Sequence, residues 1–395
     1  MRMRYYALAL VTLLNFLNYI DRFVLAAVLP RVKTELVLTD FQLGLLANAF
    51  LVAYFLTSPV FGVLGDRLSR PRLMAAGVSA WSVATAAAGL TRNFVQLLIA
   101  RAWVGVGEAA YATISPALLS DYFPRAQRGR AFSIFYVAIP VGAAAGFLLG
   151  GALEHAFGWR AAFYAVGLPG VALSLLALRL HDPPRGATEE APASPLASIR
   201  SSLTGLLTNF PYVGTVLGYA AYTFALGGLA FFMPTYLERV RGVDLSRADF
   251  IVGSVTVLSG LSGTFAGGYL GDWIATRFKH GQLWLCGISS VAGIIPTWLA
   301  LTSPAYIGWL FIAEFLLFLS TGPVNVVIVN VVPAGVRAMA MALSIFTIHL
   351  LGDAISPPII GWLADIRGLG EAVLVVPIAV AISGLLWTGT AAAAN

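Results

Sequence analysis

Residues 94–119 read FVQLLIARAWVGVGEAAYATISPALL, an apolar run interrupted by the charges of Arg101 and Glu108. An apolar run of roughly 18 residues or more predicts a membrane-spanning helix. A second opposite pair, Asp21 and Arg22, interrupts another apolar run. An ionised side chain near the bilayer centre costs at least about 2.5 kcal/mol, so it persists only beside a partner or a water-filled cavity. The four charges therefore predict a polar pathway through a membrane protein.

The composition agrees with this setting. Of 395 residues, 59% are hydrophobic and only 11% are charged. No soluble core needs so much apolar surface, so we expect an all-α membrane protein. Twelve apolar stretches predict transmembrane helices, at 5–30, 41–64, 73–90, 94–119, 129–153, 160–179, 211–236, 247–270, 283–301, 305–328, 337–362 and 371–392.

The basic residues predict the orientation of these helices. Cytoplasmic loops retain Lys and Arg, and most of the 24 Lys and Arg fall on the inner side if the N-terminus is cytoplasmic. We therefore expect a multi-pass protein of the inner (plasma) membrane with both termini in the cytoplasm. The net charge of +6 follows from this topology, which argues against nucleic-acid binding.

One long polar segment divides the chain. Residues 181–202 contain several prolines and acidic residues, and this composition predicts a flexible cytoplasmic linker. We expect an N-terminal domain at 1–180, a linker at 181–204 and a C-terminal domain at 205–395, with six helices in each domain.

Short motifs recur in the two halves. The motif GVLGD, which ends at Asp66, returns as GYLGD, which ends at Asp272, at an offset of 206 residues. A PxxxR motif that ends at Arg128 returns at Arg337, at an offset of 209 residues. Because both motifs lie at predicted inner helix ends, duplication explains them better than chance. Parallel six-helix repeats around a midplane site are typical of secondary transporters.

Several stretches resemble a known family. The loop GVLGDRLSRPR (62–72) resembles the loop between helices two and three of the major facilitator superfamily, and Arg101, Gly105 and Gly107 resemble its fourth-helix motif. Four longer stretches are similar to the bacterial type of its Spinster branch: LNYIDRFVLAAVLP (17–30), RAWVGVGEAAYATISPALLSDYFP (101–124), SIFYVAIPVG (133–142) and HLLGDAISPPIIG (349–361).

The resemblance implies the major facilitator fold, with twelve helices in two six-helix bundles, and a secondary transporter that works by alternating access. It also implies an amphipathic lipid substrate, such as a lysophospholipid or a sphingosine-phosphate-like molecule, with coupling to protons. Proton-coupled transport of small organic anions is the alternative, because related carriers share NYxDR-like and RxxxGxxEA-like segments.

The four membrane charges are expected to lie close together. Helix geometry places Asp21 at a depth in the membrane between those of Arg101 and Glu108. Arg101 and Glu108 are seven residues apart, so they lie on one face of their helix. We expect an Asp21–Arg101 pair, with Glu108 below it and Arg22 about 100° round its helix. Because a nearby guanidinium influences whether a buried carboxylate binds a proton, these four residues are the predicted proton-coupling set. The alternative is a permanent ion-pair clamp between two helices.

A lipid substrate needs a cavity with apolar walls and a polar end. The residues predicted to contact it are Arg101, Glu108, Tyr54, Tyr111, Phe224, Glu314, Asn325 and His349. Structural alternatives stay open at this point: the aromatic rings can face lipid, neighbouring Ser or Asn can satisfy Glu314, and His349 can be a packing residue.

Charged residues near the inner helix ends predict a gate. They are Asp66, Arg67, Arg70, Asp121, Arg125, Arg128 and Asp272, together with Asp353 next to the helix-breaking Ser-Pro-Pro at 356–358. Pairs of opposite charge can close this side in one state and separate in the other. Retention of topology by arginine alone would not explain the repeated aspartates.

Other functional classes lack their signatures. The sequence has no HExxH or CxxC motif and no nucleophile with its base, so we expect no enzyme, no metal and no cofactor. The single cysteine, Cys286, excludes an internal disulfide. The expected partners are a lipid-like substrate, protons and membrane lipids, with no nucleic acid, and the protein is expected to be a monomer. A sensor or scaffold is the alternative to a transporter.

Overall fold

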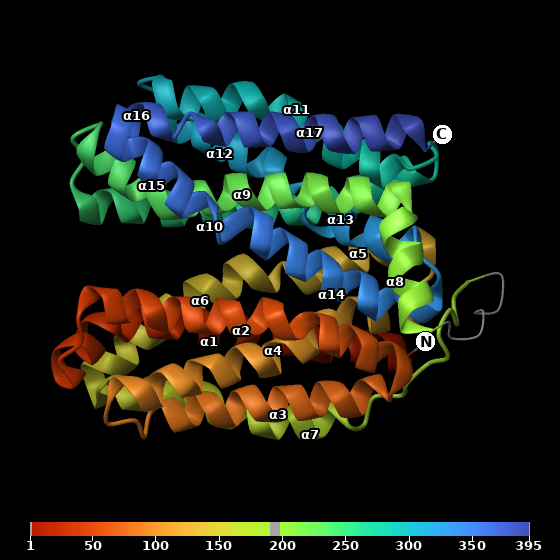
Figure 1. The fold of residues 1–395 in the computed structure, drawn as a ribbon, viewed down its shortest axis with the longest axis horizontal. Coiled ribbons are helices and arrows are strands. Elements are labelled where there is room, and N and C mark those ends of the chain that lie inside the picture. Colours follow the sequence, from red (N-terminus) through yellow and green to blue (C-terminus); the bar gives the residue numbers. More distant parts are fainter. Residues whose placement is uncertain (1, 190–197, 395) are drawn as a thin grey trace. The chain divides into compact units, whose positions relative to one another are not determined.

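The computed structural model describes residues 2–189 and 198–394, and the elements in these two ranges are helices (Figure 1). The first half of the chain contains α1 (Arg2–Leu36), α2 (Asp40–Arg67), α3 (Arg70–Ala88), α4 (Phe94–Tyr122), α5 (Arg125–Tyr136), α6 (Ala138–Phe157) and α7 (Trp159–Ala177). The second half contains α8 (Ile199–Thr208), α9 (Phe210–Arg239), α10 (Leu245–Ala275), α11 (Gly281–Thr302), α12 (Tyr306–Phe318), α13 (Thr321–Asn330), η1 (Ala334–Val336), α14 (Arg337–Ile348), η2 (His349–Asp353), α15 (Ser356–Arg367), α16 (Leu369–Ala372) and α17 (Val375–Ala393).

Eleven helical stretches of the described chain are long and apolar enough to cross a membrane. Some of them run through a break in the helix: Arg125–Phe157 joins α5 to α6, and Tyr306–Asn330 joins α12 to α13. Ala334–Arg367 runs from η1 to α15, and Leu369–Ala393 joins α16 to α17. The remaining predicted segment, 73–90, falls mostly within the 19-residue helix α3, which is not among the eleven. The predicted all-helical fold is confirmed.

Local sequence explains where several helices begin. Asn93 caps α4, because its side chain accepts a hydrogen bond from the Gln96 N–H at 3.0 Å. Thr39 and Gln42 form a capping box at the start of α2. Between α6 and α7, Gly158 has a φ of 81°, a conformation that favours glycine.

The contacts divide the chain into two compact units. Unit 1 comprises Met1–Phe123, Ile134–Leu196 and Ala334–Leu343, and unit 2 comprises Pro124–Ser133, Ala197–Pro333 and Ser344–Asn395. Each unit therefore includes a short segment from the other half of the sequence, the start of α14 in unit 1 and the start of α5 in unit 2. The predicted domain boundaries stay a prediction.

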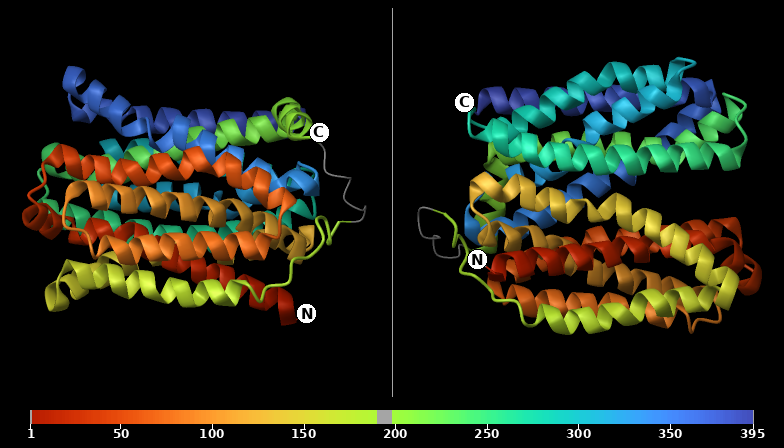
Figure 2. Two further views of the ribbon diagram at one scale, coloured as in Figure 1. Left: turned by 60° about the horizontal axis from the view of Figure 1, so that its bottom comes forward. Right: turned by 180° about the vertical axis from the view of Figure 1, so that it is seen from behind.

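In unit 1 the long helices run roughly parallel (Figure 2). α4 packs against both α2 and α3, and α6 packs along α1 through the glycine stripe Gly142, Gly146 and Gly150. A Cβ atom at Gly146 would lie 2.8 Å from the Ile20 carbonyl oxygen, so the close approach of these helices requires glycine. This packing brings the charged positions of α1 and α4 within reach of one another.

In unit 2, α17 packs against α9 and α11. Trp387 of α17 is fully buried, and its indole N–H donates to the Thr215 carbonyl of α9 at 2.9 Å. Gly218 of α9 lies against the same ring, where a Cβ atom would not fit. These contacts fix α9, which carries the predicted substrate residue Phe224.

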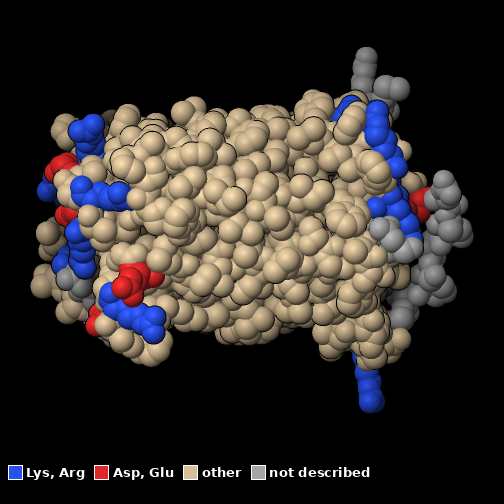
Figure 3. Space-filling model, turned by 90° about the horizontal axis from the view of Figure 1, so that it is seen from above, with Lys and Arg blue, Asp and Glu red and all other residues tan. Residues whose placement is uncertain are grey.

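Charged side chains gather near the two ends of the helices on the face shown in Figure 3. The wide band between these ends shows no Lys, Arg, Asp or Glu on that face. An uncharged band with charged ends is typical of a surface embedded in a membrane.

Candidate functional site

The four predicted membrane charges meet inside unit 1. Asp21 and Arg22 lie on α1, and Arg101 and Glu108 lie on α4. Arg22 Nε is 2.7 Å from Glu108 Oε2, and Arg101 Nη1 is 3.9 Å from Asp21 Oδ1. Glu108 is fully buried, and the exposed fraction of Arg101 is 3%. The predicted Asp21–Arg101 pair is confirmed, and Arg22 completes the set by binding Glu108.

Neighbouring side chains surround these charges. The hydroxyl of Thr85, on α3, donates a hydrogen bond to Asp21 Oδ2. The guanidinium carbon of Arg22 lies 4.9 Å from the centroids of three aromatic rings, those of Tyr19, Phe50 and Tyr54. Such cation–π contacts offset part of the cost of burying a guanidinium. We call Asp21, Arg22, Arg101 and Glu108 the charge cluster.

Part of the hydrogen-bonding capacity of the charge cluster is unused within the described ranges of the chain. Arg101 Nε and Nη1, Glu108 Oε1 and Asp21 Oδ1 are buried and make no hydrogen bond to any described residue. A buried polar atom without a partner costs roughly 1–3 kcal/mol. The charge cluster therefore offers both donors and acceptors to a ligand, to water or to a proton.

The two tyrosines predicted to contact substrate have different surroundings. Tyr54 stacks on Phe50, next to the charge cluster. The Tyr111 hydroxyl donates to the Val11 carbonyl, and its ring packs edge-on against Trp81 at a centroid distance of 5.3 Å. Tyr54 is thus close to the charges, whereas Tyr111 packs between helices, and its contact with substrate stays a prediction.

Unit 2 contains a buried carboxylate that is bound by hydroxyl groups. Glu314 of α12 accepts hydrogen bonds from Thr256 Oγ1 at 3.0 Å and from Ser259 Oγ at 2.9 Å, both on α10. Asn325 of α13 donates to the Thr321 carbonyl at 2.9 Å. The hydroxyl partners agree with the alternative in which neighbouring polar side chains satisfy Glu314.

His349 and Asp353 form a pair in the π-helical turn η2. His349 Nδ1 lies 2.8 Å from Asp353 Oδ1. Gly352, between them, has non-helical backbone angles (φ −111°, ψ −106°) and lies against α9 from Ala220 to Phe224. The expected bend next to Asp353 is therefore present, and π-helical turns of this kind are frequent at functional sites.

Asp66 and Asp272 make matching contacts in their own units. Asp66 accepts hydrogen bonds from the backbone N–H groups of Ala338 and Met339, at the start of α14, both at 2.9 Å. Asp272 accepts hydrogen bonds from two backbone N–H groups of α5, at 2.8 and 3.0 Å. These two pairs of N–H groups are 209 residues apart in the chain, the offset of the PxxxR motif. The duplication therefore extends from the motifs to their contacts.

A second contact repeats in the same way. In unit 1, Arg337 Nη1 lies 2.9 Å from Asp121 Oδ1. In unit 2, Arg128 donates a hydrogen bond to Asn330, the residue that follows Asp121 by 209 positions. Both arginines are almost fully buried. The predicted gate residues thus include members of two matching networks.

The start of the predicted linker is bound to unit 1. Its contacts include Arg70 with Asp182 at 2.7 Å, the Gly186 N–H with Asp121 at 2.9 Å, and Arg337 with Glu189. We call residues 182–189 the strap. The prediction that 181–202 is flexible is wrong for the strap, because buried ion pairs and backbone hydrogen bonds hold it. The end of that segment forms the start of α8, and 190–197 lie outside the described residues.

Sequence reasoning missed Thr85, Asn330 and Glu189. Asn330 could have been found by applying the 209-residue offset to Asp121. Thr85 is one hydroxyl residue in an apolar helix, and Glu189 is one acidic residue in a polar linker. No motif or repeat in the sequence marks either residue as functional. Three predicted gate residues lie outside the two networks and the strap contacts: Arg67 and Arg125 are exposed at the surface, and Asp353 pairs with His349.

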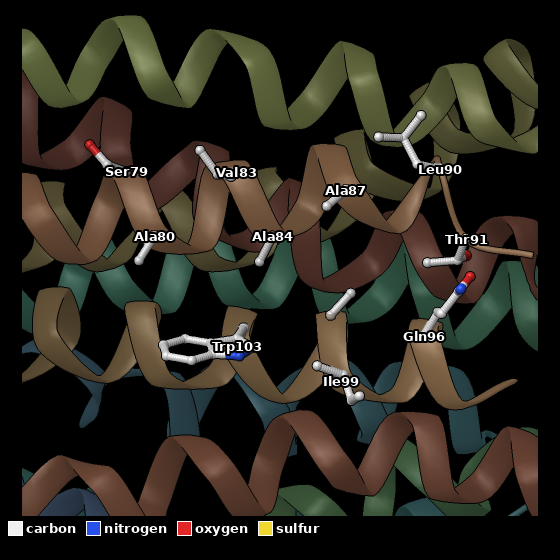
Figure 4. A pocket seen from close by; sticks show the side chains of 11 residues that line it. Ser79, Ala80, Val83, Ala84, Ala87, Leu90, Thr91, Gln96, Ile99 and Trp103 are labelled. Carbon is white, nitrogen blue, oxygen red and sulfur yellow. The ribbon is translucent and has the colours of Figure 1, made fainter. Parts of the chain in front are cut away.

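Unit 1 also has an apolar groove of about 790 Å³ between α3 and α4 (Figure 4). Ala80 and Ala84 of α3 and Trp103 of α4 point into the space between the two helices. None of the predicted site residues lines it. Exposed apolar surface of this kind suits contact with lipid chains.

The chain matches the family model of the Major Facilitator Superfamily over residues 11–346. It is 35% identical over 385 residues to protein spinster homolog 3 of Danio rerio, which covers 92% of this chain and 77% of that protein. It is 36% identical over 386 residues to protein spinster homolog 1 of Homo sapiens, with coverage of 90% and 72%. The chain belongs to the Spinster family. This Spinster chain is therefore a multi-pass membrane transporter of a small-molecule substrate and not an enzyme.

Solved transporters share the fold of this Spinster chain. A bacterial homolog of the human lysosomal transporter Spinster, in an inward-facing and unoccupied conformation, has a TM-score of 0.68 at 24% identity, over 99% of this chain and 97% of that chain. FucP, a major facilitator transporter in the outward conformation, has a TM-score of 0.79 at 17% identity, over 97% and 98%. The predicted major facilitator fold is confirmed.

Proposed function

We propose that this chain is a proton-coupled transporter of an amphipathic anion, such as a lysophospholipid or a sphingosine-phosphate-like lipid, that works by alternating access. The charge cluster is the observation that supports this most strongly, because it pairs Arg22 with Glu108 and Arg101 with Asp21 in the interior of unit 1. Ionisable residues inside membrane segments are typical of substrate and proton pathways.

Arg101 is the proposed anion-binding residue. Its distance of 3.9 Å from Asp21 is long for an ion pair, and its Nε and Nη1 make no hydrogen bond to a described residue. A phosphate or carboxylate head group offers the paired acceptors that a guanidinium binds best. Phe50 and Tyr54, next to the cluster, supply aromatic surface for the adjoining part of an amphipathic molecule.

Glu108 and Asp21 are the proposed proton carriers. With both carboxylates ionised and both arginines charged, the four formal charges of the cluster balance. An anion bound at Arg101 would leave an excess negative charge in a low-dielectric site, which is unfavourable. Uptake of one proton by Glu108 or Asp21 removes that excess. Binding of substrate and binding of a proton therefore favour each other.

Asp66 and Asp272 are the proposed inner gate. Each carboxylate binds the first turns of a helix from the other half of the sequence, α14 for Asp66 and α5 for Asp272. Backbone N–H groups near a helix start favour an anionic partner. Opening of the inner side breaks these contacts, so their free energy contributes to the balance between the two states. The η2 turn at Asp353 is the proposed bending point.

The proposed location is the inner (plasma) membrane, with both termini cytoplasmic and a single chain as the working unit. The support is the distribution of Lys and Arg along the sequence. Protons and membrane lipids are the proposed partners besides the substrate. The proposed domains are 1–180 and 205–395, joined by 181–204.

Competition binding tests the substrate class. A fluorescent lysophospholipid is bound to the purified protein and displaced with unlabelled lysophospholipid or with succinate. We expect displacement by the lysophospholipid alone, and binding weakened by about tenfold in Arg101→Gln, because a hydrogen bond to a charged group is lost. Arg31→Gln is the matched control, since Arg31 pairs with Glu154 at 2.8 Å near the end of α1.

Displacement by succinate alone would support the alternative, a proton-coupled transporter of small organic anions. Equal affinity of the wild type and Arg101→Gln for the lysophospholipid would contradict the proposed role of Arg101.

A further inference from the structure

Unit 2 has a pocket of about 940 Å³ beside Asp272. We call it the end pocket, because five membrane-spanning stretches begin or end at residues that line it: Arg125, Phe210, Ala275, Gly281 and Asn330. Helix ends of a membrane protein lie near the boundary between hydrocarbon and water. The end pocket is therefore placed where lipid head groups are found.

The end pocket combines basic and apolar side chains. Arg125 and Lys279 are exposed residues of its lining, and His280 lies next to Lys279. Lys279 Nζ donates a hydrogen bond to the Ala394 carbonyl at 3.1 Å, and an ammonium group has three N–H donors. Phe210 and Phe278, which also line it, have exposed fractions of 55% and 62%. Basic pockets between membrane helices on the cytoplasmic side bind the head groups of anionic lipids. Exposed aromatic rings at the same depth suit the start of the acyl chains.

One acidic residue, Asp272, also lines the end pocket. It is almost fully buried, and each of its carboxylate oxygens accepts a backbone hydrogen bond from α5. Gln282 also lies within 3.4 Å of Asp272 Oδ1. Both carboxylate oxygens of Asp272 are therefore already engaged by N–H donors of the chain.

Unit 1 shows what covers the corresponding position there. The end-pocket residues Asp272, Thr276 and Asn330 follow, by 206 or 209 positions, three residues of unit 1: Asp66, Arg70 and Asp121. Arg70 and Asp121 both bind the strap. The strap brings two carboxylates to this position, those of Asp182 and Glu189, which pair with Arg70 and Arg337. In unit 1, anionic groups of the chain itself thus occupy this position. In unit 2, the corresponding position is an open pocket.

We propose that the end pocket binds the phosphate head group of an anionic membrane phospholipid, in the position that the strap carboxylates take in unit 1. Arg125 and Lys279 bind the phosphate, and Phe210 and Phe278 contact the first part of the acyl chains. The exposed aromatic rings favour a lipid over an acidic peptide, because they can contact acyl chains. The position at the helix ends favours a lipid over free phosphate, because lipid head groups lie at that depth.

A bound lipid would also stabilise one conformation. Arg125 belongs to α5, whose first turns are held by Asp272 of α10, and Lys279 belongs to the loop between α10 and α11. A head group that bridges Arg125 and Lys279 therefore favours the state in which α5 is docked on α10. This consequence rests on the proposed alternating access, whereas the binding site does not.

Native mass spectrometry of the purified full-length protein tests the site. Dioctanoyl phosphatidylglycerol is the anionic probe, and dioctanoyl phosphatidylcholine and inorganic phosphate are the comparison probes. We expect phosphatidylglycerol to bind most tightly, and its affinity to fall on the order of tenfold in the double variant Arg125→Gln/Lys279→Gln. Lys279→Arg should retain the wild-type affinity. Arg277→Gln is the matched control, because Arg277 is exposed in the same loop but does not line the end pocket.

Hydrogen exchange supplies a second readout. Phosphatidylglycerol should slow exchange of the backbone amides at 125–133 in the wild type and not in the double variant. Equal binding of phosphatidylcholine and phosphatidylglycerol to the wild type would overturn the proposal without the use of any variant. If inorganic phosphate protected the same amides equally, the ligand would be a free anion and not a lipid. If Arg277→Gln lowered the affinity for phosphatidylglycerol as much as the double variant does, the end pocket would be excluded as the binding site. Neither readout involves transport, so a failure here is distinct from a failure of the proposed function.

Discussion

At the scale of single residues, the charge cluster determines both stability and the proposed chemistry. Arg22 and Glu108 form an ion pair of 2.7 Å in which Glu108 is fully buried. Loss of one partner of such a pair leaves an uncompensated charge, which costs about 3–5 kcal/mol, whereas replacement of both partners by neutral groups costs far less. The pair can therefore be tested as a unit.

We predict that Arg22→Gln destabilises the protein by about 3 kcal/mol and that the double variant Arg22→Gln/Glu108→Gln recovers most of this loss. The thermal midpoint of unfolding in detergent at pH 8 measures both effects. The matched control is Arg31→Gln, because the Arg31–Glu154 pair is largely exposed on its arginine side and contributes about 0–1 kcal/mol. A double variant that is less stable than Arg22→Gln would contradict this account.

Some contacts at this scale follow from the sequence and others do not. The pairing of Asp21 with Arg101 follows from the depth of each residue along its helix, which depends only on chain position. The pairing of Arg22 with Glu108 depends on side-chain rotamers, and the bond from Thr85 depends on how α3 packs beside α1. Packing of this kind leaves no periodic signal in the sequence.

At the scale of helices, close packing relies on glycine at particular positions. A Cβ atom at Gly146 would lie 2.8 Å from the Ile20 carbonyl oxygen, whereas one at Gly151 would have no described residue of another helix within 4 Å. We predict that Gly146→Val destabilises unit 1 by about 1–3 kcal/mol through overpacking. Gly151→Val, further along α6 and on another face of the helix, should change stability by less than about 0.5 kcal/mol. Thermal midpoints that fall equally in both variants would refute the packing argument.

The contact of Asp66 with the start of α14 gives a second prediction at this scale. Asp66→Asn retains one oxygen acceptor for the two N–H groups of Ala338 and Met339 and loses the charge. We predict a shift of about tenfold toward states with the inner side open, as expected from the loss of one hydrogen bond to a charged group. Electron resonance distances between spin labels at the inner ends of α2 and α14 measure this shift. The control is Asp249→Asn, at an exposed position of α10, which should leave the distances unchanged. If the distances were also unchanged in Asp66→Asn, Asp66 would be excluded from the gate.

The long helices were predicted from the sequence, whereas most of the breaks within them were overlooked. Runs of apolar residues located every long helix, because the bilayer demands them. The breaks after Tyr136 and Phe318 and the break before Ser356 all had a local signal, because Pro140, Pro323 and Pro357 follow them closely and a proline cannot donate the i→i−4 hydrogen bond. The π-helical turn η2 itself had no comparable signal.

At the scale of the whole molecule, the sequence predicts which side each loop faces. With Cys286 replaced by Ala, a single cysteine is introduced at Ser198 or at Arg241, and sealed cells are treated with an impermeant maleimide. We predict that the label reaches position 241 and not position 198, because the linker is cytoplasmic. The native Cys286 is buried, so its replacement should have little effect on labelling. Labelling at 198 in sealed cells would reverse the proposed topology.

The duplication was visible in the sequence, and its full extent was not. Two motifs at offsets of 206 and 209 residues predicted the repeat, and the structure extends it to Asn330 and to the backbone contacts of Asp272. The strap could not be predicted, because its prolines and charges also suit a flexible linker. What distinguishes it is the set of partners it meets in unit 1, Arg70, Asp121 and Arg337.

The central claim is that Asp21 and Glu108 carry the proton that drives transport, and proton-driven flux tests it most directly. Uptake of a lysophospholipid into proteoliposomes under a pH gradient is measured beside counterflow at symmetric pH, for the wild type, Glu108→Gln, Asp21→Asn and the control Glu154→Gln. We predict that both cluster variants lose pH-driven accumulation and retain counterflow. Either amide keeps the shape of the site and removes one negative charge, so an anion binds without the uptake of a proton. Glu154→Gln should retain both activities. Normal pH-driven accumulation in both Glu108→Gln and Asp21→Asn would contradict the account and reduce the charge cluster to a structural clamp.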